Sequence, residues 1–279
     1  MQNVAYHKIY QGASTMSKVE SFQMEIPQLG RMRTIWVYLP DNYNQKGNPY
    51  PVIYMHDGQN IFYDRLTSYG TAWHVDKTMD QIYQLTGKGA IVVGVECNPA
   101  RRLSEYSPWK TNLPMKGMPA INRGGEGAKY AEFFAKNLKA EIDSKYNTDP
   151  QRVATAVIGS SMGGLISLYI GLKYQRLYET MGLFSPFTPF NFGAYRRFLK
   201  KTPQILPQHA LVYCGGKENI SVSDKIMEKA SIELYYKLSQ RQVVTELLFN
   251  SDMTHFERAW DIYFRKFAMD FLNRYYAQL

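Results

Sequence analysis

The chain has 279 residues, of which 45% are hydrophobic and 20% are charged, and its formal net charge is +9. This composition is typical of globular proteins and excludes collagenous, coiled-coil and intrinsically disordered chains. The positive charge favours anionic partners, but the basic residues are scattered and no zinc-finger spacing or RNA-binding aromatic motif occurs, so we expect no nucleic-acid partner.

Apolar runs and helical patterns alternate along the chain. Short continuous apolar runs are typical of strands covered on both faces, and apolar residues at helical spacing are typical of amphipathic helices. In chain order the sequence predicts strands at 34–39 and 52–55, a helix at 72–85, a strand at 90–95, a helix at 130–142, a strand at 153–158, a helix at 165–174, strands at 181–184 and 211–214, a helix at 224–238, a strand at 243–249 and a helix at 257–276.

This alternation predicts an α/β fold with a mainly parallel central sheet and helices on both faces. We found no repeat or linker, so residues 1–279 are expected to form one domain. The stretches 96–126 and 186–208 lack either pattern and are predicted to be loop insertions. Both follow strands, and therefore lie at the carboxyl edge of the sheet, where such folds bind ligands.

The sequence also suggests a compartment. No run of 18 apolar residues occurs, and the first 18 residues lack the apolar centre of a secretory signal peptide. Cys97 and Cys214 each end an apolar run, which is typical of reduced buried thiols. We therefore expect a cytoplasmic protein with no membrane partner.

One motif points to nucleophilic chemistry. Residues 159–163 read Gly-Ser-Ser-Met-Gly, which fits G-x-S-x-G, a sharp turn that lifts a serine hydroxyl out of a sheet. An apolar strand pattern precedes the motif and a helical pattern follows it, as this turn requires. The sequence predicts Ser161 as a nucleophile; the alternative is a glycine-rich turn without chemistry.

A serine nucleophile needs a histidine base, which follows it in the chain of such enzymes. His255 comes after the last predicted strand and before the last helix, so it would lie at the carboxyl edge of the sheet. His209 begins a strand, and the other histidines precede Ser161. His56 stands beside Asp57, but no third ligand has recognised metal spacing, so we expect no metal.

The histidine in turn needs a carboxylate between nucleophile and base in the sequence. Glu218 follows the strand at 211–214 and is the favoured acid. Asp224 and Asp252 remain alternatives, although Asp224 is also a natural helix cap.

An oxyanion needs two preorganised N–H donors. The residue after the nucleophile, Met162, supplies one, and the early strand-to-helix loop supplies the other. In that loop we favour the N–H of Gln59, with Gly58 as the alternative.

Together these segments resemble the putative esterase (esterase D-like) family of α/β-hydrolases, which includes feruloyl, enterochelin and acetyl-type esterases. The resemblance covers most of the chain and rests on residues 54–62, Arg102 with 105–108, glycines 124, 125 and 127 with Tyr130, residues 159–164, residues 215–218, and His255 with Trp260. It implies a hydrolase that uses Ser161, Glu218 and His255 without metal or cofactor.

The two insertions are predicted to form the acyl and alcohol pockets. They carry Trp109, Phe187, Phe190 and Tyr195, and we expect substrate contacts from Trp109, Arg102, Tyr106 and Phe187. The alternative is that these aromatics only cover the end of the sheet. Arg101, Arg102, Arg196 and Arg197 favour an anionic or phenolic-acid substrate, unless they are simply solvated.

These features predict a serine carboxylic-ester hydrolase that forms an acyl-enzyme with a small or medium acyl or aromatic ester. The expected partner is that small-molecule ester. An acyltransferase with the same residues is the main alternative, and a peptidase or a non-catalytic binding module are others. The sequence leaves open whether the chain forms a homo-oligomer.

Overall fold

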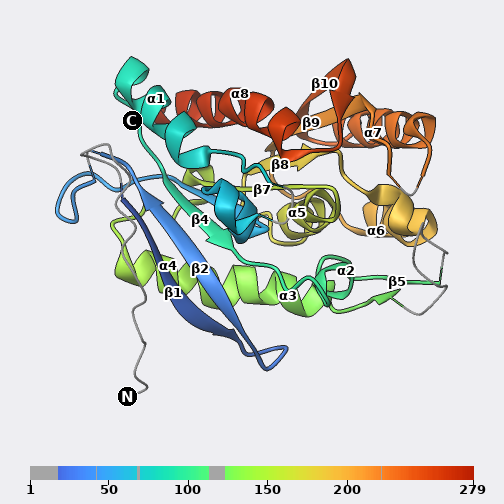
Figure 1. The fold of residues 1–279 in the computed structure, drawn as a ribbon, viewed down its shortest axis with the longest axis horizontal. Coiled ribbons are helices and arrows are strands. Elements are labelled where there is room, and N and C mark those ends of the chain that lie inside the picture. Colours follow the sequence, from blue (N-terminus) through green and yellow to red (C-terminus); the bar gives the residue numbers. More distant parts are fainter. Residues whose placement is uncertain (1–17, 42, 68–69, 113–122, 221) are drawn as a thin grey trace.

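The computed structural model describes residues 18–41, 43–67, 70–112, 123–220 and 222–279, and an eight-stranded twisted sheet runs through its centre (Figure 1). The strand order is β1-β2-β4-β3-β7-β8-β9-β10. β2 runs antiparallel to both of its neighbours, β1 and β4. Along the rest of the sheet, in the order β4-β3-β7-β8-β9-β10, each strand runs parallel to the next. The strands are β1 (Lys18–Ile26), β2 (Arg31–Leu39), β3 (Val52–His56), β4 (Ile91–Val95), β7 (Thr155–Ser160), β8 (Thr180–Phe184), β9 (Gln208–Lys217) and β10 (Val243–Thr254).

Helices cover both faces of this sheet. α1 and α8 pack together on one face, and α3, α4, α5 and α7 cover the other. The helices are α1 (Val75–Thr86), α2 (Arg102–Glu105), α3 (Gly127–Phe133), α4 (Lys139–Lys145), α5 (Met162–Lys173), α6 (Phe192–Lys201), α7 (Asp224–Ser239) and α8 (Glu257–Tyr276), with a π-helical turn at Phe134–Leu138 and a short ribbon of β5 (Lys110–Thr111) and β6 (Arg123–Gly124). The predicted α/β fold is therefore confirmed.

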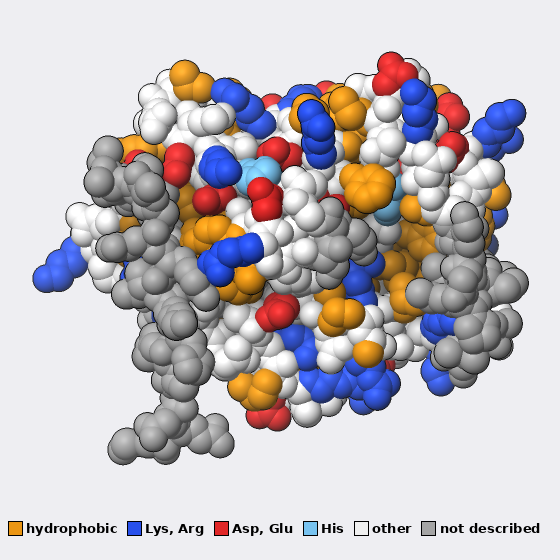
Figure 2. Space-filling model, viewed as in Figure 1, with side chains coloured by type: hydrophobic (Ala, Val, Ile, Leu, Met, Phe, Trp, Pro, Cys, Tyr) orange, Lys and Arg blue, Asp and Glu red, His pale blue; other side chains and the backbone are white. Residues whose placement is uncertain are grey.

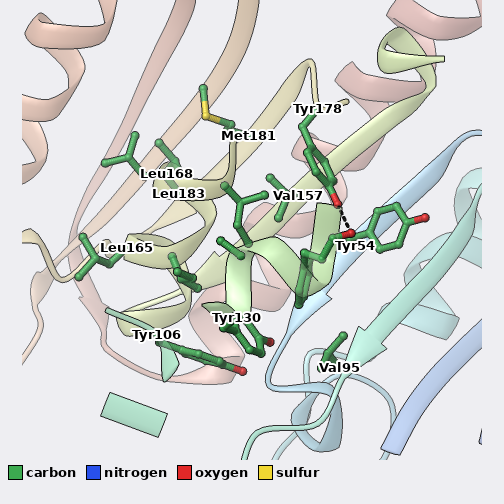
Figure 3. Close-up of a cluster of buried hydrophobic side chains, with 14 of the residues drawn as sticks. Tyr54, Val95, Tyr106, Tyr130, Val157, Leu165, Leu168, Tyr178, Met181 and Leu183 are labelled. Carbon is green, nitrogen blue, oxygen red and sulfur yellow. Dashed lines mark hydrogen bonds between the residues drawn. The ribbon is translucent and has the colours of Figure 1, made fainter. Parts of the chain in front are cut away.

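Residues of the central strands alternate between two apolar cores because successive side chains of a strand point to opposite faces. In β3, Tyr54 belongs to the core under α3 to α5, whereas Ile53 and Met55 belong to the core under α1 and α8. Figure 3 shows part of the first of these cores, a cluster to which Tyr54 and Val157 of the sheet and Leu165 of α5 all belong. Burial of both faces explains the continuous apolar runs of the sequence.

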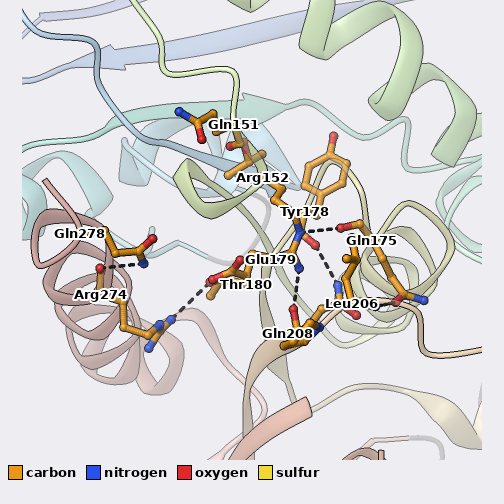
Figure 4. A network of polar contacts seen from close by, with 12 residues as sticks. Gln151, Arg152, Gln175, Tyr178, Glu179, Thr180, Leu206, Gln208, Arg274 and Gln278 are labelled. Atoms are coloured by element: carbon orange, nitrogen blue, oxygen red, sulfur yellow. Dashed lines mark hydrogen bonds and ion pairs between the residues drawn. The ribbon is translucent and has the colours of Figure 1, made fainter. Parts of the chain in front are cut away.

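A polar network closes the amino-terminal edge of the sheet (Figure 4). The fully buried Gln208 donates from its amide to the backbone oxygens of Gly171 and Tyr178, at 3.0 and 2.8 Å. Arg152 donates to the backbone oxygen of Gln175 and pairs with Glu179. These bonds satisfy the buried side chains of Gln208 and Arg152 and fix this edge, whereas ligands in sheets of this kind bind at the opposite, carboxyl edge.

The seven predicted strands are all present, but the structure differs from the sequence prediction in several places. β1 was not predicted, since only Val19, Phe22 and Ile26 of this edge strand are buried and the residues between them form no apolar run. The segment 96–126 contains the short helix α2 and the β5–β6 ribbon rather than loop alone, and β10 continues to Thr254. The segment 186–208 is not a loop throughout: it contains α6, whose first turn is capped by the side chain of Asn191. β7 begins at Thr155, after a 3₁₀ turn.

Among the helices of the described ranges, none is both long and apolar enough to cross a membrane.

The packing of α8 gives a stability prediction. Phe264 is fully buried against Trp73, whereas Ile262, two residues earlier, is 53% exposed. We expect Phe264→Ala to lower the free energy of unfolding by about 3–5 kcal/mol, because it leaves a cavity in the core. Ile262→Ala is the matched control and should cost less than about 1 kcal/mol. Urea denaturation measures both, and equal losses would contradict this assignment of the buried face.

Candidate active site

The turn between β7 and α5 holds Ser161 in an unusual backbone conformation. Its φ is 57° and its ψ is −120°, a region that non-glycine residues rarely occupy. The backbone N–H of Ser161 donates to the oxygen of Phe184 at 2.8 Å, and its own oxygen accepts from Phe187 at 2.9 Å. The neighbouring strand end β8 thus fixes the turn, and Ser161 lines a cavity at the carboxyl edge of the sheet.

Close backbone contact explains one glycine of this turn. A Cβ atom on Gly159 would lie 2.7 Å from the backbone carbon and oxygen of Gly163, closer than atoms tolerate. A Cβ atom on Gly163 would meet His56 at 3.4 Å and Oδ2 of Asp57 at 3.5 Å, both ordinary contact distances. The first glycine of the motif is therefore required by the fold, and the second has room for a methyl group.

His255 lies where β10 ends and α8 begins, and its Nδ1 contacts Oε2 of Glu218. Glu218 is only 1% exposed, and its other oxygen accepts hydrogen bonds from the backbone N–H of Gly215, at 2.7 Å, and from the hydroxyl of Ser185, at 2.8 Å. Because Oε1 is occupied in this way, Oε2 is directed at the imidazole. The carboxylate is thus locked onto His255.

The other two carboxylates considered as partners of His255 lie elsewhere. Asp224 accepts from the backbone N–H of Asn219 at the start of α7. Asp252 pairs with Lys217, and its side chain is 81% exposed. Neither lines the cavity, whereas Glu218 does.

An indole supports the imidazole from α8. The ring of Trp260 meets that of His255 edge to face, with centroids 5.0 Å apart. Its Nε1 lies 3.4 Å from the Ser185 hydroxyl that donates to Glu218. A buried aromatic ring with a satisfied N–H restricts the rotation of the histidine side chain.

The cavity at this edge has a volume of about 420 Å³. Five segments of the chain form its wall, and the wall includes Ser161, His255 and Glu218, the residues that the sequence predicts as nucleophile, base and acid. Its walls are formed by Asp57, Gln59, Asn60, Cys97, Pro99, Arg102, Leu103, Ser160, Ser161, Glu218, Asn219, Ile220, His255, Phe256, Glu257 and Trp260.

The residues named as oxyanion donors flank this cavity. Met162 is the first residue of α5, a position whose backbone N–H has no acceptor within a helix. Gln59 lies in a 3₁₀ turn after β3, and its side chain exchanges hydrogen bonds with Cys97, both at 3.0 Å. Gly58 is enclosed by the backbone of Gly94, 2.8 Å from where a Cβ would lie. The turn that carries Gln59 is therefore held in one place.

Arg102 reaches the cavity, but its guanidinium is already occupied. Nε and Nη2 donate to the two oxygens of Asp57 at 2.8 and 2.7 Å. Burial raises the pKa of Asp57, but the guanidinium of Arg102 outweighs it and the pKa is below its usual value. Arg102 and Asp57 thus form a neutral pair beside the cavity.

The aromatic residues predicted to contact substrate are not brought to the cavity wall. Tyr106 is fully buried, and its hydroxyl accepts from the backbone N–H of Asp57. Phe187 is 4% exposed in the core, and Trp109 packs against the rings of Tyr169 and Phe198. Phe190 and Tyr195 are buried too. These rings serve packing here: Phe190 and Tyr195 belong to the 3₁₀ turn and the helix into which part of 186–208 folds, and Tyr106 and Trp109 pack against other aromatic rings. Residues 113–122 of the other insertion lie outside the described residues.

Several wall residues were not anticipated. Glu257 and Asn60 are buried polar residues of the wall, and Phe256 is a half-exposed aromatic beside His255. The available signal was position: Asn60 ends the strand-to-helix turn that carries Gln59, and Glu257 follows His255 by two residues. Neither residue type alone distinguishes a cavity wall from a helix terminus.

His56 is enclosed rather than available to a ligand. It is 2% exposed, its Nδ1 lies 3.2 Å from the hydroxyl of Tyr130, and the ring of Phe134 lies 4.7 Å away. Burial lowers the pKa of His56 to about 3. Across the described ranges, no group of three or more His, Cys, Asp or Glu side chains is placed to hold a metal ion.

The pKa of His56 predicts a pH dependence of stability. Below about pH 6.5 the unfolded chain binds a proton at this residue while the folded chain does not, so stability falls as the pH is lowered. Between pH 6.5 and 5 the loss is about 2 kcal/mol, at roughly 1.4 kcal/mol per pH unit. The difference in free energy of unfolding between the native protein and His56→Gln, measured by urea denaturation, should change by about this amount between pH 6.5 and 5. Groups that titrate in both proteins, such as Glu257, whose raised pKa acts in the opposite direction, cancel in this difference. Equal pH slopes would refute the prediction.

The two motif glycines give a second prediction. Gly159→Ala should lower the free energy of unfolding by about 1–3 kcal/mol, because the methyl group must displace the backbone at Gly163. Gly163→Ala is the control, and it should be neutral or stabilising by up to ~1 kcal/mol, since it replaces a helical glycine that has space. Thermal unfolding of both variants checks the prediction, and the reverse order would contradict it.

The chain is similar in sequence to a known family and to known proteins. The model of a family described as "Putative esterase" matches residues 26–243. The uncharacterized protein YbbA of Bacillus subtilis is 26% identical over 153 residues, which is 55% of this chain and 56% of YbbA; the chain thus spans about half the length of this relative.

Two solved structures share the fold at low identity. An IroE-like serine hydrolase from Shewanella oneidensis has a TM-score of 0.74 at 18% identity, over 90% of this chain and 79% of that one. The siderophore hydrolase EstA from Aspergillus nidulans has a TM-score of 0.75 at 16% identity, over 98% and 100% of the two chains.

Proposed function

The chain belongs to the "Putative esterase" family, and from this premise we propose that it is a serine carboxylic-ester hydrolase that works through an acyl-enzyme. The observation that carries the proposal is the contact between His255 and Glu218 in the cavity that Ser161 also lines. A serine on a strained turn, a histidine and a buried carboxylate are the three groups that acyl transfer requires.

In the proposed first half-reaction the Ser161 hydroxyl oxygen attacks the ester carbonyl carbon while Nε2 of His255 accepts the hydroxyl proton. Glu218 holds the Nδ1–H and stabilises the imidazolium. The N–H groups of Met162 and Gln59 donate to the oxyanion. The C–O bond of the ester then breaks, and the imidazolium donates its proton to the departing alcohol.

In the second half-reaction water takes the place of the alcohol. His255 accepts a proton from water as its oxygen attacks the acyl carbon, and the second tetrahedral intermediate collapses. The proton returns to the oxygen of Ser161, and the carboxylic acid leaves. No metal or cofactor takes part in these steps.

The cavity supports a small or medium acyl or aromatic ester as substrate. Its volume of about 420 Å³ lies within the range of sites for small molecules. The arginines that suggested an anionic substrate give little support, because Arg102 is bound by Asp57 and Arg196 by Glu233. Figure 2 shows basic side chains spread over the visible face, with acidic side chains among them. We therefore propose a neutral ester, with siderophore and ferulic acid esters, named for neighbours in fold, in the first screen.

A serine substitution tests the proposal most directly. Ser161→Ala should lower turnover of p-nitrophenyl esters, from acetate to decanoate, and of methyl ferulate by on the order of 10⁴-fold or more. Ser167→Ala, which removes a buried hydroxyl without a partner from the same helix, is the matched control and should keep its activity. Substantial hydrolysis by Ser161→Ala would refute the mechanism.

The identity of the acid is tested by an isosteric change. Glu218→Gln preserves shape but removes the charge that stabilises the imidazolium, so we expect kcat to fall by about 10²–10⁴-fold. Asp252→Asn, which changes an exposed carboxylate beyond the cavity, should leave kcat within about twofold. Initial-rate kinetics on one ester measure both. If Asp252→Asn were the more damaging change, Glu218 would not be the acid.

A further inference from the structure

A second carboxylate lines the cavity, and the proposed mechanism does not use it. Glu257 is the first residue of α8, is 3% exposed and belongs to the cavity wall. Its recorded side-chain partner is the amide nitrogen of Asn60, at 3.4 Å, the long end of the hydrogen-bond range. Its own backbone N–H is a second partner, and the two together still leave part of the hydrogen-bonding capacity of a carboxylate unused.

Its neighbour on the wall also has an unused acceptor. Asn60 is 6% exposed, and its Oδ1 has no hydrogen-bond partner among the described residues. This oxygen is itself enclosed, so the wall acceptor that a group in the cavity can use is the carboxylate of Glu257, and Asn60 supports that carboxylate through its amide nitrogen. Residues of α8 and of the turn after β3 therefore meet at one part of the wall.

The charges around this cavity define what fits there. Arg102 is the only Lys or Arg among the wall residues in the described part of the chain, and Asp57 binds it through both oxygens. Within the described ranges Glu257 forms no ion pair, so its negative charge is not balanced by the protein. The surroundings favour a donor that is neutral or positive and disfavour an anion.

We infer that Glu257 and Asn60 form a subsite that binds a hydrogen-bond donor, a hydroxyl or an ammonium group, carried by the ester substrate. This inference rests on the proposed function, since it concerns the substrate of the same cavity. A donor would bind the carboxylate of Glu257, which the amide nitrogen of Asn60 helps to hold in place. A charged hydrogen bond that replaces a contact with water is strong enough to change specificity by about tenfold or more.

The carboxyl group should titrate near neutral pH. Burial raises the pKa of Glu257 to about 7; the negative charge of Asp57 also raises it, while its own backbone N–H and the guanidinium of Arg102 lower it. A cationic substrate should therefore gain affinity as the pH rises through 7, because the carboxyl group then becomes charged.

Matched probes test the inference. We would measure kcat and KM for p-nitrophenyl benzoates whose 3-substituent is hydrogen, hydroxyl, aminomethyl or carboxylate, and for benzyl acetates with the same four substituents. We expect the hydroxyl or the aminomethyl probe of one series to exceed its unsubstituted parent by about tenfold in kcat/KM, mainly through KM. The carboxylate probe should fall below the parent. The probe with the larger gain in kcat/KM, hydroxyl or aminomethyl, shows whether the subsite prefers a neutral or a positively charged donor.

Two variants assign this preference to the subsite. Glu257→Gln should bring the ratio of donor to parent to within about twofold of one. Glu246→Gln makes the same chemical change on β10, at a side chain that pairs with Lys266, and should keep the ratio. A uniform fall in kcat on every probe, with the ratio unchanged, would overturn the inference, as would the absence of any donor preference in both series.

A pH series on the native protein remains informative if Glu257→Gln does not fold. The ratio of aminomethyl probe to parent cancels the ionisation of the catalytic groups that both substrates share. It should rise between pH 6 and 8, and a constant ratio would overturn the inference for an ammonium group. Hydrolysis by Ser161→Ala would instead refute the proposed function. The two failures are distinguishable, because the Ser161→Ala result concerns activity on every probe, whereas the inference concerns only the ratio between a substituted probe and its parent.

Discussion

The contact between Glu218 and His255 is the interaction around which the site is organised. One carboxylate oxygen faces the imidazole because the other accepts from Gly215 at the end of β9 and from Ser185 after β8. Trp260 of α8 holds both the imidazole and the Ser185 hydroxyl. Three segments that are distant in sequence therefore fix one imidazole ring, and the parallel sheet brings them to the same edge.

Much of this arrangement is predictable because the relevant signals are local. Continuous apolar runs predict strands buried on both faces, and the order of strand, motif and helix predicts the sharp turn at Ser161. His255 and Glu218 could be named because each follows a strand of the parallel sheet. The edge strand β1 could not, because its few buried residues, such as Val19 and Phe22, are separated by polar or partly exposed ones and form no apolar run.

The cavity wall is less predictable because it depends on packing between distant segments. Phe187 and Tyr106 follow strands or lie in an insertion, as wall residues would, but they fill space beneath the site. Arg102 does reach the wall, yet its charge is taken up by Asp57, a partner 45 positions earlier. Composition and spacing report neither where a side chain points nor which partner it meets.

The position of Glu257 affects how this scaffold can diversify. Glu257 lies in the first turn of α8 together with Trp260, whose ring contacts His255. A replacement of Glu257 that changes what the cavity accepts therefore also disturbs the segment that holds His255. The wall also includes Pro99 and Leu103, which come from a separate segment of the chain and form no hydrogen bond with the imidazole or its carboxylate among the described residues. Evolution of new specificity should therefore proceed by drift at 99 and 103, with position 257 changing late and together with compensating substitutions in α8.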